Sequence, residues 1–224
     1  MKKNNVFIIA AHPDDEVLGA GGSILKHVDV KDTVRILILS DGEKSKSTKV
    51  NVEQRQKQAH KVAGMLKVKD LILEKFPDNQ FDSLPILQII KKIECHLQKI
   101  KPNIIYTHFV HDLNIDHQLT FQAVLTACRP QPSFFVKKIF SFEIPSSTEW
   151  QIKDQTYAFC PNEYHDITNF INQKIEILKI YKGELRKYPH PRSIIGVKAL
   201  AQLRGMEVGL LYAEGFQIVR NIED

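Results

Sequence analysis

The chain has 224 residues, of which 43% are hydrophobic, and its formal net charge is +5. This size and hydrophobic content suffice for one sizeable core, so we expect one domain over residues 1–224, and no membrane span because no apolar run approaches ~20 residues. The three cysteines are widely spaced and odd in number, which argues against a disulfide framework and a cysteine-ligated zinc site and favours a reducing, cytoplasmic compartment.

Strand-like and helix-like patterns alternate along most of the chain. Apolar runs predict strands at residues 6–11, 34–39, 70–76, 103–107 and 136–144. Helical patterns lie between these runs, at residues 16–28, 52–66, 84–100 and 117–128, and are followed by helices at 168–182 and 193–208 and a last strand at 215–219. This alternation predicts a Rossmann-like α/β fold, with a doubly wound, mostly parallel sheet and helices on both faces.

A histidine and two aspartates directly follow the first expected strand, in the run His12-Pro13-Asp14-Asp15-Glu16. Pro13 prevents regular strand pairing, so the strand ends there, and an aspartate of this run can cap the helix that begins next. The carboxyl ends of parallel strands are where α/β folds place their ligands. A histidine and an aspartate three positions apart across this turn can therefore converge on one metal ion.

A second polar cluster follows the fourth expected strand and ends in Asp116-His117. Catalytic zinc sites use three protein ligands and leave the fourth position to water, so His12, Asp15 and His117 would complete such a set. Asp14 would then be available as the general base beside that water. Each cluster alone has a more ordinary explanation, as a helix cap or as a surface hydrogen bond. Their matching positions at two strand ends favour the metal site.

Together these residues resemble the LmbE-like, or PIG-L, family of zinc-dependent deacetylases, which remove N-acetyl groups from molecules that contain N-acetylglucosamine. The resemblance runs over nearly the whole chain. It extends to Ser40-Asp41-Gly42-Glu43, Arg55, Phe76-Pro77-Asp78-Asn79, Arg204-Gly205 and Tyr212-Ala213-Glu214-Gly215-Phe216.

The resemblance implies a role for several of these residues. In the family, Asp14 matches the general base, and Arg55 and Asp78 match residues in segments that contact the sugar hydroxyls. The zinc ligands of the family are the residues that match His12, Asp15 and His117.

Two positions depart from the family pattern. The family commonly has a histidine three positions before its last zinc ligand, where it stabilises the oxyanion or protonates the leaving amine, and this chain has Asn114 there. We keep Asn114 as a candidate substrate-binding residue. We expect that His111 or His190 supplies the missing role, or that catalysis relies more heavily on zinc and the general base. In the family, a glutamate often follows the arginine that matches Arg55 by three residues and pairs with it. This chain has Gln58 at that position, so Arg55 lacks this carboxylate partner.

Two further segments bear on function. The glycines of residues 19–22 lie inside an expected helix rather than in the turn before it, so we expect close packing on the sheet and not a dinucleotide site. The loop with Trp150 is a candidate border of the substrate cleft. Prolines on both sides of His190 stiffen the loop that holds it, although a histidine in a surface loop commonly has no function.

The basic charge has two interpretations. Most lysines recur at helical spacing without interleaved aromatic residues, which is typical of solvated helix faces and argues against a nucleic-acid partner. The exception is the loop with Lys44, Lys46 and Lys49, which is expected at the same sheet edge as the metal site. That loop either meets an anionic substrate or is a mobile polar segment.

We therefore expect a zinc-dependent enzyme that removes the acetyl group from an amino sugar, either neutral or anionic, and we leave a homo-oligomer open. One alternative is a metal-containing glycan-binding protein in which Asn114 marks lost catalysis. Another is an amidohydrolase that acts on a different amide. The intact Asp14 argues against the binding protein, because a binder has no need of a base beside a metal-bound water.

Overall fold

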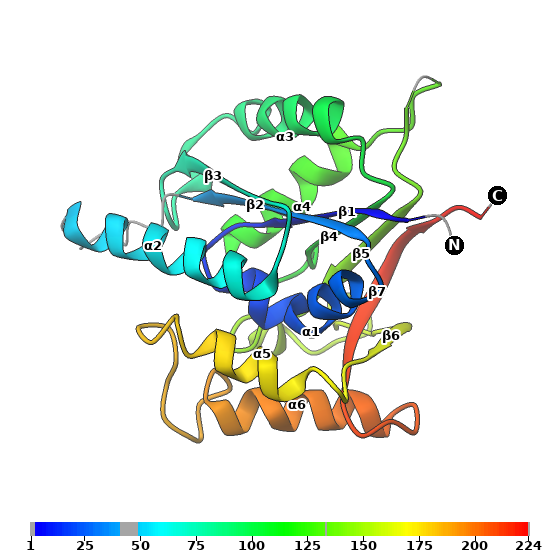
Figure 1. Cartoon of the computed structure of the whole chain (residues 1–224). Helices are drawn as coiled ribbons and strands as arrows, with labels where there is room; N and C mark the ends of the chain where they lie inside the picture. Colours follow the sequence, from blue (N-terminus) through cyan, green and yellow to red (C-terminus); the bar gives the residue numbers. More distant parts are fainter. Residues whose placement is uncertain (1–2, 41–48, 133, 224) are drawn as a thin grey trace.

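The computed structural model describes residues 3–40, 49–132 and 134–223, and it has the expected α/β fold (Figure 1). Its strands are β1 (Asn5–Ala10), β2 (Thr33–Ser40), β3 (Asp70–Phe76), β4 (Ile104–His108), β5 (Lys138–Phe142), β6 (Glu163–Asp166) and β7 (Ala213–Asn221). Within the described ranges these seven strands form one sheet in the order β3-β2-β1-β4-β5-β7-β6. Strands β1 to β5 pair in parallel, and β7 is antiparallel to both of its neighbours.

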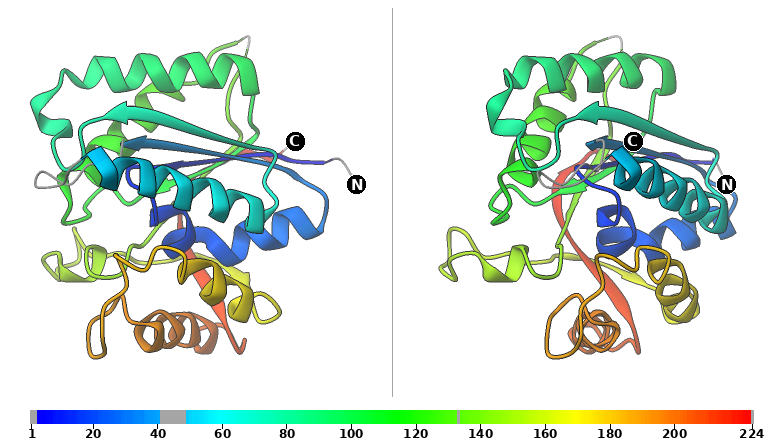
Figure 2. Two further views of the ribbon diagram at one scale, coloured as in Figure 1. Left: turned by 60° about the vertical axis from the view of Figure 1, so that its left-hand side comes forward. Right: turned by 90° about the vertical axis from the view of Figure 1, so that its left-hand side faces the viewer.

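The helices form layers on the two faces of the sheet. They are α1 (Asp15–Asp29), α2 (Lys49–Leu66), α3 (Ile86–Ile100), α4 (Ile115–Ala127), α5 (Ile171–Leu178) and α6 (Ile194–Met206), with short 3-10 helices at Phe81–Ser83 and Thr148–Trp150. Helices α3 and α4 cover one face, and α1 and α2 lie on the other (Figures 1 and 2). Helices α5 and α6 add a further layer beyond α1 (Figure 2). No helix in the described part of the chain is both long and apolar enough to cross a membrane.

The core explains why the first strand reads as an uninterrupted apolar run. Successive side chains of a strand point to opposite faces, and both faces of this sheet are covered by helices. Val6 and Ile8 belong to the hydrophobic cluster under α1, and Phe7 and Ile9 belong to the cluster under α3 and α4. All four side chains are fully buried, as the sequence predicts for a central parallel strand.

The sequence missed or misplaced several boundaries. The polar strand β6 was not expected, because Glu-Tyr-His-Asp has no apolar alternation and pairs only with β7 at the edge of the sheet. The strand expected at residues 136–144 is restricted to Lys138–Phe142, and the helix expected at 168–182 to Ile171–Leu178. Helix α2 begins at Lys49, three residues before the expected start.

Helix α1 is packed tightly against its neighbours, as its glycines predict. A Cβ atom at Gly19 would lie 2.4 Å from the Phe142 ring, and one at Gly22 would lie 2.5 Å from Ile167. The helix is kinked at Ala20, where φ is −143° and ψ is 16°. The Glu214 carboxylate accepts hydrogen bonds from the amides of residues 22 and 23, both at 2.8 Å, so β7 holds the helix at its kink.

The order of the strands creates a crevice at one edge of the sheet. From β1 the chain moves outward to β2 and β3, whereas from β4 it moves outward in the opposite direction to β5. The loops that follow β1 and β4 therefore diverge to opposite faces of the sheet. Open α/β folds bind their ligands at such a switch point.

Candidate active site

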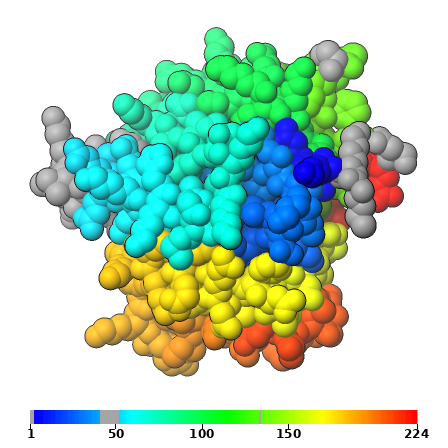
Figure 3. All heavy atoms as spheres, viewed as in Figure 1, coloured from blue at the N-terminus to red at the C-terminus, as the bar shows by residue number. Residues whose placement is uncertain are grey.

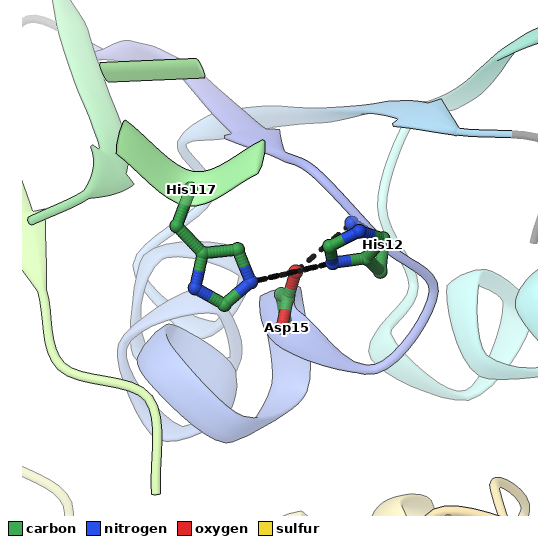
Figure 4. Close-up of side chains that lie close together, drawn as sticks. All are labelled: His12, Asp15 and His117. Carbon is green, nitrogen blue, oxygen red and sulfur yellow. Dashed lines mark hydrogen bonds and ion pairs between the residues drawn. The ribbon is translucent and has the colours of Figure 1, made fainter. Parts of the chain in front are cut away.

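Three side chains that the sequence predicts as metal ligands meet at this switch point (Figure 4). His12 lies in the turn after β1, Asp15 is the first residue of α1, and His117 lies in the first turn of α4. His12 Nδ1 is 3.2 Å from Asp15 Oδ2, and His117 Nε2 is 3.3 Å from the same oxygen. The two nitrogens are 3.3 Å apart.

The local backbone fixes this arrangement. In the turn after β1, the Asp15 amide donates to the His12 carbonyl at 3.3 Å, and the His12 amide donates to Asp15 Oδ2 at 2.9 Å. Asn114 caps α4, since its Oδ1 accepts from the Asp116 amide at 2.8 Å. The residue that stands in place of the family histidine therefore orients the helix that carries His117.

Each imidazole is held on its outer nitrogen by a carboxylate. His117 Nδ1 lies 3.0 Å from Asp112 Oδ1, and His12 Nε2 lies 3.0 Å from Asp116 Oδ2. A ring nitrogen that donates to a carboxylate keeps its proton, so the other nitrogen of the same ring is the one that can bind a metal. Both of these inner nitrogens face Asp15 Oδ2.

The three donor atoms fit a zinc ion. A tetrahedral site with bonds of 2.0–2.1 Å has donor atoms about 3.3–3.4 Å apart, close to the separations of 3.2 and 3.3 Å found here. Asp15 Oδ1 is buried and has no hydrogen-bond partner among the residues that the structure describes. His12 Nε2 also lies near Asp78 and Asp116, a second possible donor set. We favour the first set because it alone includes His117, whose ring the Asp112 carboxylate orients.

Protons compete with a metal at this site. Burial alone would lower the pKa of His12, but hydrogen bonds with Asp116 and Asp15 outweigh it and raise that pKa to about 10. Burial is likewise outweighed at His117, where Asp15 and Asp112 raise the pKa to about 9. A metal ion therefore has to displace protons from these rings at neutral pH.

Asp112 is the most heavily hydrogen-bonded carboxylate of the site. Besides His117, it accepts from the hydroxyls of Ser147 and Thr148 and from the Asn114 amide, the last at 2.9 Å. Burial alone would raise its pKa, but the hydrogen bonds from His117 and the two hydroxyls lower it to about 2. Asp112 therefore stays ionised and ties His117 to the loop after β5.

The buried ring of His108 supports His117 from the side. The two rings are stacked with their centroids 3.9 Å apart. Burial holds the pKa of His108 well below its usual range, and its Nε2 accepts a hydrogen bond from the Ala11 amide at 2.8 Å. The ring is therefore neutral and fixed between β1 and α4.

Asp14 lies beside the three candidate metal ligands in an unusual backbone conformation. Its φ is 125°, a region that residues other than glycine rarely adopt, and the residue is only 2% exposed. Burial raises the pKa of Asp14 to about 7, against the opposing effect of the Arg192 guanidinium, whose Nη1 is 3.2 Å from Asp14 Oδ2. A buried carboxyl with a pKa near neutrality is suited to accept and return a proton.

A pocket of about 130 Å³ opens onto these residues. Its walls include the expected substrate-binding residues Arg55, Asp78 and Asn114. Neither His111 nor His190 is among the lining residues. A larger pocket of about 190 Å³, between α3, the end of α4 and the following loop, contains none of the predicted site residues.

The two candidate histidines have other partners. The His111 ring meets the ring of Tyr157 edge-on, with centroids 4.8 Å apart. His190 packs edge-on against Trp150, and its Nδ1 accepts a hydrogen bond from the Arg192 amide at 3.1 Å. Trp150 is 53% exposed, and it is not among the residues that line the pocket.

The structure adds two charged residues that the sequence did not single out. Arg55 of α2 pairs with Glu184, which follows α5, so the clamp that Gln58 cannot form is made by a residue 129 positions away. The surfaces of α2 and of the segment around α5 adjoin in the space-filling view (Figure 3). Arg192 also lines the pocket. The proline-flanked loop that drew attention to His190 was the only signal for Arg192.

Most of the expected basic loop, including Lys44 and Lys46, lies outside the described residues, as does Asp41 of the family-like segment.

A family model for GlcNAc-PI de-N-acetylase, PIG-L, matches residues 7–128, which is more than half of the chain. The chain belongs to the PIG-L family. The match contains the three metal-binding candidates and Asp14, so the family resemblance seen in the sequence is confirmed.

Two curated relatives are named as deacetylases. The uncharacterized deacetylase YaiS of Escherichia coli is 24% identical over 81% of this chain and 92% of its own length. The probable N-acetyl-alpha-D-glucosaminyl L-malate deacetylase 2 of Bacillus cereus is 22% identical over 81% of this chain and 84% of its own.

Solved structures share the fold. The N,N'-diacetylchitobiose deacetylase of Pyrococcus horikoshii superposes with a TM-score of 0.76 at 21% identity, covering 96% of this chain and 83% of that one. The 4-carboxy-2-hydroxymuconate hydratase GalB of Pseudomonas putida has the same TM-score at 21% identity, covering 100% and 99%. The fold thus supports more than one chemistry, and the activity has to be argued from the site.

Proposed function

We propose that this chain is a zinc-dependent hydrolase that removes the N-acetyl group from an N-acetylglucosamine-containing substrate and releases acetate. In this proposal His12, Asp15 and His117 hold the zinc and Asp14 is the general base. One observation carries it: three donor atoms lie at tetrahedral spacing, beside a buried carboxyl whose pKa is about 7. Membership of the PIG-L family supports the same reaction.

When bound at such a site, zinc supplies a water of lowered pKa, about 7, and a Lewis acid for the amide oxygen. The residues of the chain orient the histidine rings and transfer the proton. Asp112 and Asp116 keep the outer ring nitrogens protonated, so that the inner nitrogens would be the ones to bind the ion. Asp14 takes the proton from the attacking water, and because its pKa lies near neutrality it can then release that proton toward the leaving nitrogen.

The leaving amine has two further candidate proton donors in our proposal, His111 and His190. Neither lines the pocket, so each would need to act through a movement or through a water molecule. Replacing each by alanine separates the cases. If one variant loses kcat while its zinc content is unchanged, that histidine is the donor; if both keep full activity, Asp14 or solvent is.

The amino sugar is proposed to bind Arg55, Asp78 and Asn114. Asp78 is 5% exposed and presents a carboxylate that can accept from sugar hydroxyls, whereas Asn114 and Arg55 carry donors. An anionic substrate is the second element of this proposal, resting on the lysines of residues 44–49. Attraction by such a loop is screened over ~8 Å at physiological salt, so kcat/KM for an anionic substrate should fall as salt rises, and kcat/KM for a neutral glycoside should not.

We further propose that residues 1–224 act as one domain in a reducing compartment, the cytoplasm. Cys95, Cys128 and Cys160 are all free thiols in the structure, which is compatible with that setting. Whether the enzyme works as a homo-oligomer is open to measurement of its molecular mass in solution.

The experiment that tests the function is acetate release across a panel of N-acetylglucosamine derivatives with free, phosphorylated, nucleotide-linked and lipid-linked forms. Release from one class, and its loss in Asp14→Asn, supports the proposal and identifies the substrate. Binding of a derivative without any acetate release indicates the glycan-binding alternative. Release only from an amide that lacks the sugar indicates an amidohydrolase of another specificity.

A further inference from the structure

The strained turn at Asp14 is held in part from outside the segment that matches the family model. Asp14 adopts a φ of 125°, and neighbouring groups must offset the energetic cost of that conformation. Inside the matched region, Glu16 contributes by accepting the Asp14 amide at 3.0 Å. Further supports come from residues 181–192, which lie beyond residue 128, where the family match ends.

Two of these supports act on different groups of Asp14, one on its backbone and one on its side chain. The Tyr181 hydroxyl donates to Glu16 Oε1 at 2.7 Å, and so fixes the carboxylate that holds the Asp14 backbone. Arg192 acts on the side chain, with its Nη1 at 3.2 Å from Asp14 Oδ2 and 3.8 Å from Glu184 Oε2. Asp14 is therefore restrained at both its backbone and its carboxylate.

Arg192 is itself held in a rigid setting. Its Nε donates to the Pro145 carbonyl at 3.0 Å, and its own amide donates to His190 Nδ1 at 3.1 Å. Ser193 caps α6 by accepting the Gly196 amide at 2.9 Å. A Cβ at Gly196 would lie only 2.4 Å from the Pro191 carbonyl oxygen, so the loop packs directly on the first turn of α6.

We propose that Arg192 is a positioning residue for Asp14: its guanidinium keeps the Asp14 carboxylate aimed into the pocket. The inference rests on the proposed role of Asp14 as general base. Lysine is not an equivalent replacement, because one ammonium group cannot reach the Pro145 carbonyl and the Asp14 carboxylate with the fixed fork of a guanidinium. The role of His190 in this arrangement is to hold the Arg192 backbone.

A double-mutant cycle tests whether Arg192 acts through Asp14. A displacement of the base by about 1 Å costs up to ~10²-fold, so we expect Arg192→Gln to lower kcat by about 10–100-fold with zinc content unchanged. Adding Arg192→Gln to Asp14→Asn should then cost less than about twofold more, because the group that Arg192 positions is already lost. Guanidinium ion added to Arg192→Ala should restore part of kcat.

The control is Arg186→Gln, in the same loop, since the Arg186 guanidinium donates to the carbonyl oxygens of residues 183 and 185, and the backbone amide of Arg186, which donates to the Arg192 carbonyl at 3.2 Å, is kept in the variant. It should leave kcat unchanged. The proposal is overturned by wild-type kcat in Arg192→Gln, or by a loss of activity that multiplies with that of Asp14→Asn. A rise in KM alone also overturns it, since it would make Arg192 a substrate-binding residue.

A second readout does not depend on turnover. The amides of Val17 and Leu18 donate to the Asp14 carbonyl at 3.1 and 2.9 Å. If Arg192 restrains the turn, these amides exchange hydrogen faster in Arg192→Gln than in Arg186→Gln. Unchanged exchange overturns the positioning role. If the wild-type chain releases no acetate from any substrate, the proposed function fails, and the exchange measurement still decides whether Arg192 restrains the turn.

Discussion

Replacing Asp112 by asparagine should weaken zinc binding without removing any proposed ligand. Asp112 lies 3.0 Å from His117 Nδ1 and is held by two hydroxyls and one amide. Asparagine keeps the shape and one acceptor oxygen but loses the charge that favours a protonated Nδ1. Loss of such a supporting carboxylate typically costs 10–100-fold in metal affinity, or about 1.4–2.8 kcal/mol.

The assay is a competition between the protein and a zinc chelator at pH 7. A matched control is available in Asp32→Asn, because Asp32 holds His27 Nδ1 at 2.7 Å in the same kind of contact, on a histidine that belongs to neither candidate donor set. That variant should bind zinc as the wild type does. A zinc Kd for Asp112→Asn within twofold of the wild-type value would refute the reasoning, because it would show that Asp112 does not tune His117.

Three further predictions follow from the same structure. Asp14→Asn should keep its zinc and lose ~10²–10⁴-fold in kcat, whereas Asp15→Asn should bind zinc more weakly. Kinetics and elemental analysis measure the two effects, and if the two variants showed each other's effect, the roles of Asp14 and Asp15 would be reversed. The pKa values of His12 and His117, about 10 and about 9, lie above pH 7, so zinc binding at pH 7 should release protons, and zinc affinity should fall as the pH falls. Calorimetry in buffers of different ionisation enthalpy measures the protons released, and a result of no release would contradict this prediction. Lys174→Met breaks the buried ion pair with Glu214 and should destabilise the fold by about 3 kcal/mol, which lowers Tm by roughly 6–12 °C. The cost lies at the low end of the range for a broken buried ion pair because Glu214 keeps its hydrogen bonds to α1. Lys179→Met, which removes an exposed ion pair, should change Tm little.

The sequence predicts that His12, Asp15 and His117 lie close together, because its signals at these positions are local. A buried strand that ends in His-Pro-Asp-Asp requires a turn at Pro13, and parallel strands bring such turns to one edge of the sheet. The prediction for His12, Asp15 and His117 needs only that rule, and the structure places the three side chains together. Close packing of α1 follows in the same way from its glycines.

Contacts between residues of different helix layers cannot be predicted in this way, because no local sequence pattern marks them. Glu184 reaches Arg55 from 129 positions away, across the junction of α2 and the segment after α5, and neither residue lies in a pattern that predicts the other. Arg192 could be noticed only through the prolines beside His190. The short polar strand β6 was missed because an edge strand of four residues has no hydrophobic alternation to detect.

One measurement tests the proposed roles of His12, Asp14, Asp15 and His117 together. It compares the release of acetate from an N-acetylglucosamine derivative by metal-stripped protein and by zinc-reloaded protein. The account predicts no release by the stripped wild type, full release after one equivalent of zinc, and almost none by zinc-loaded Asp14→Asn. Equal release by the stripped and the reloaded protein would contradict it, and so would full activity of zinc-loaded Asp14→Asn.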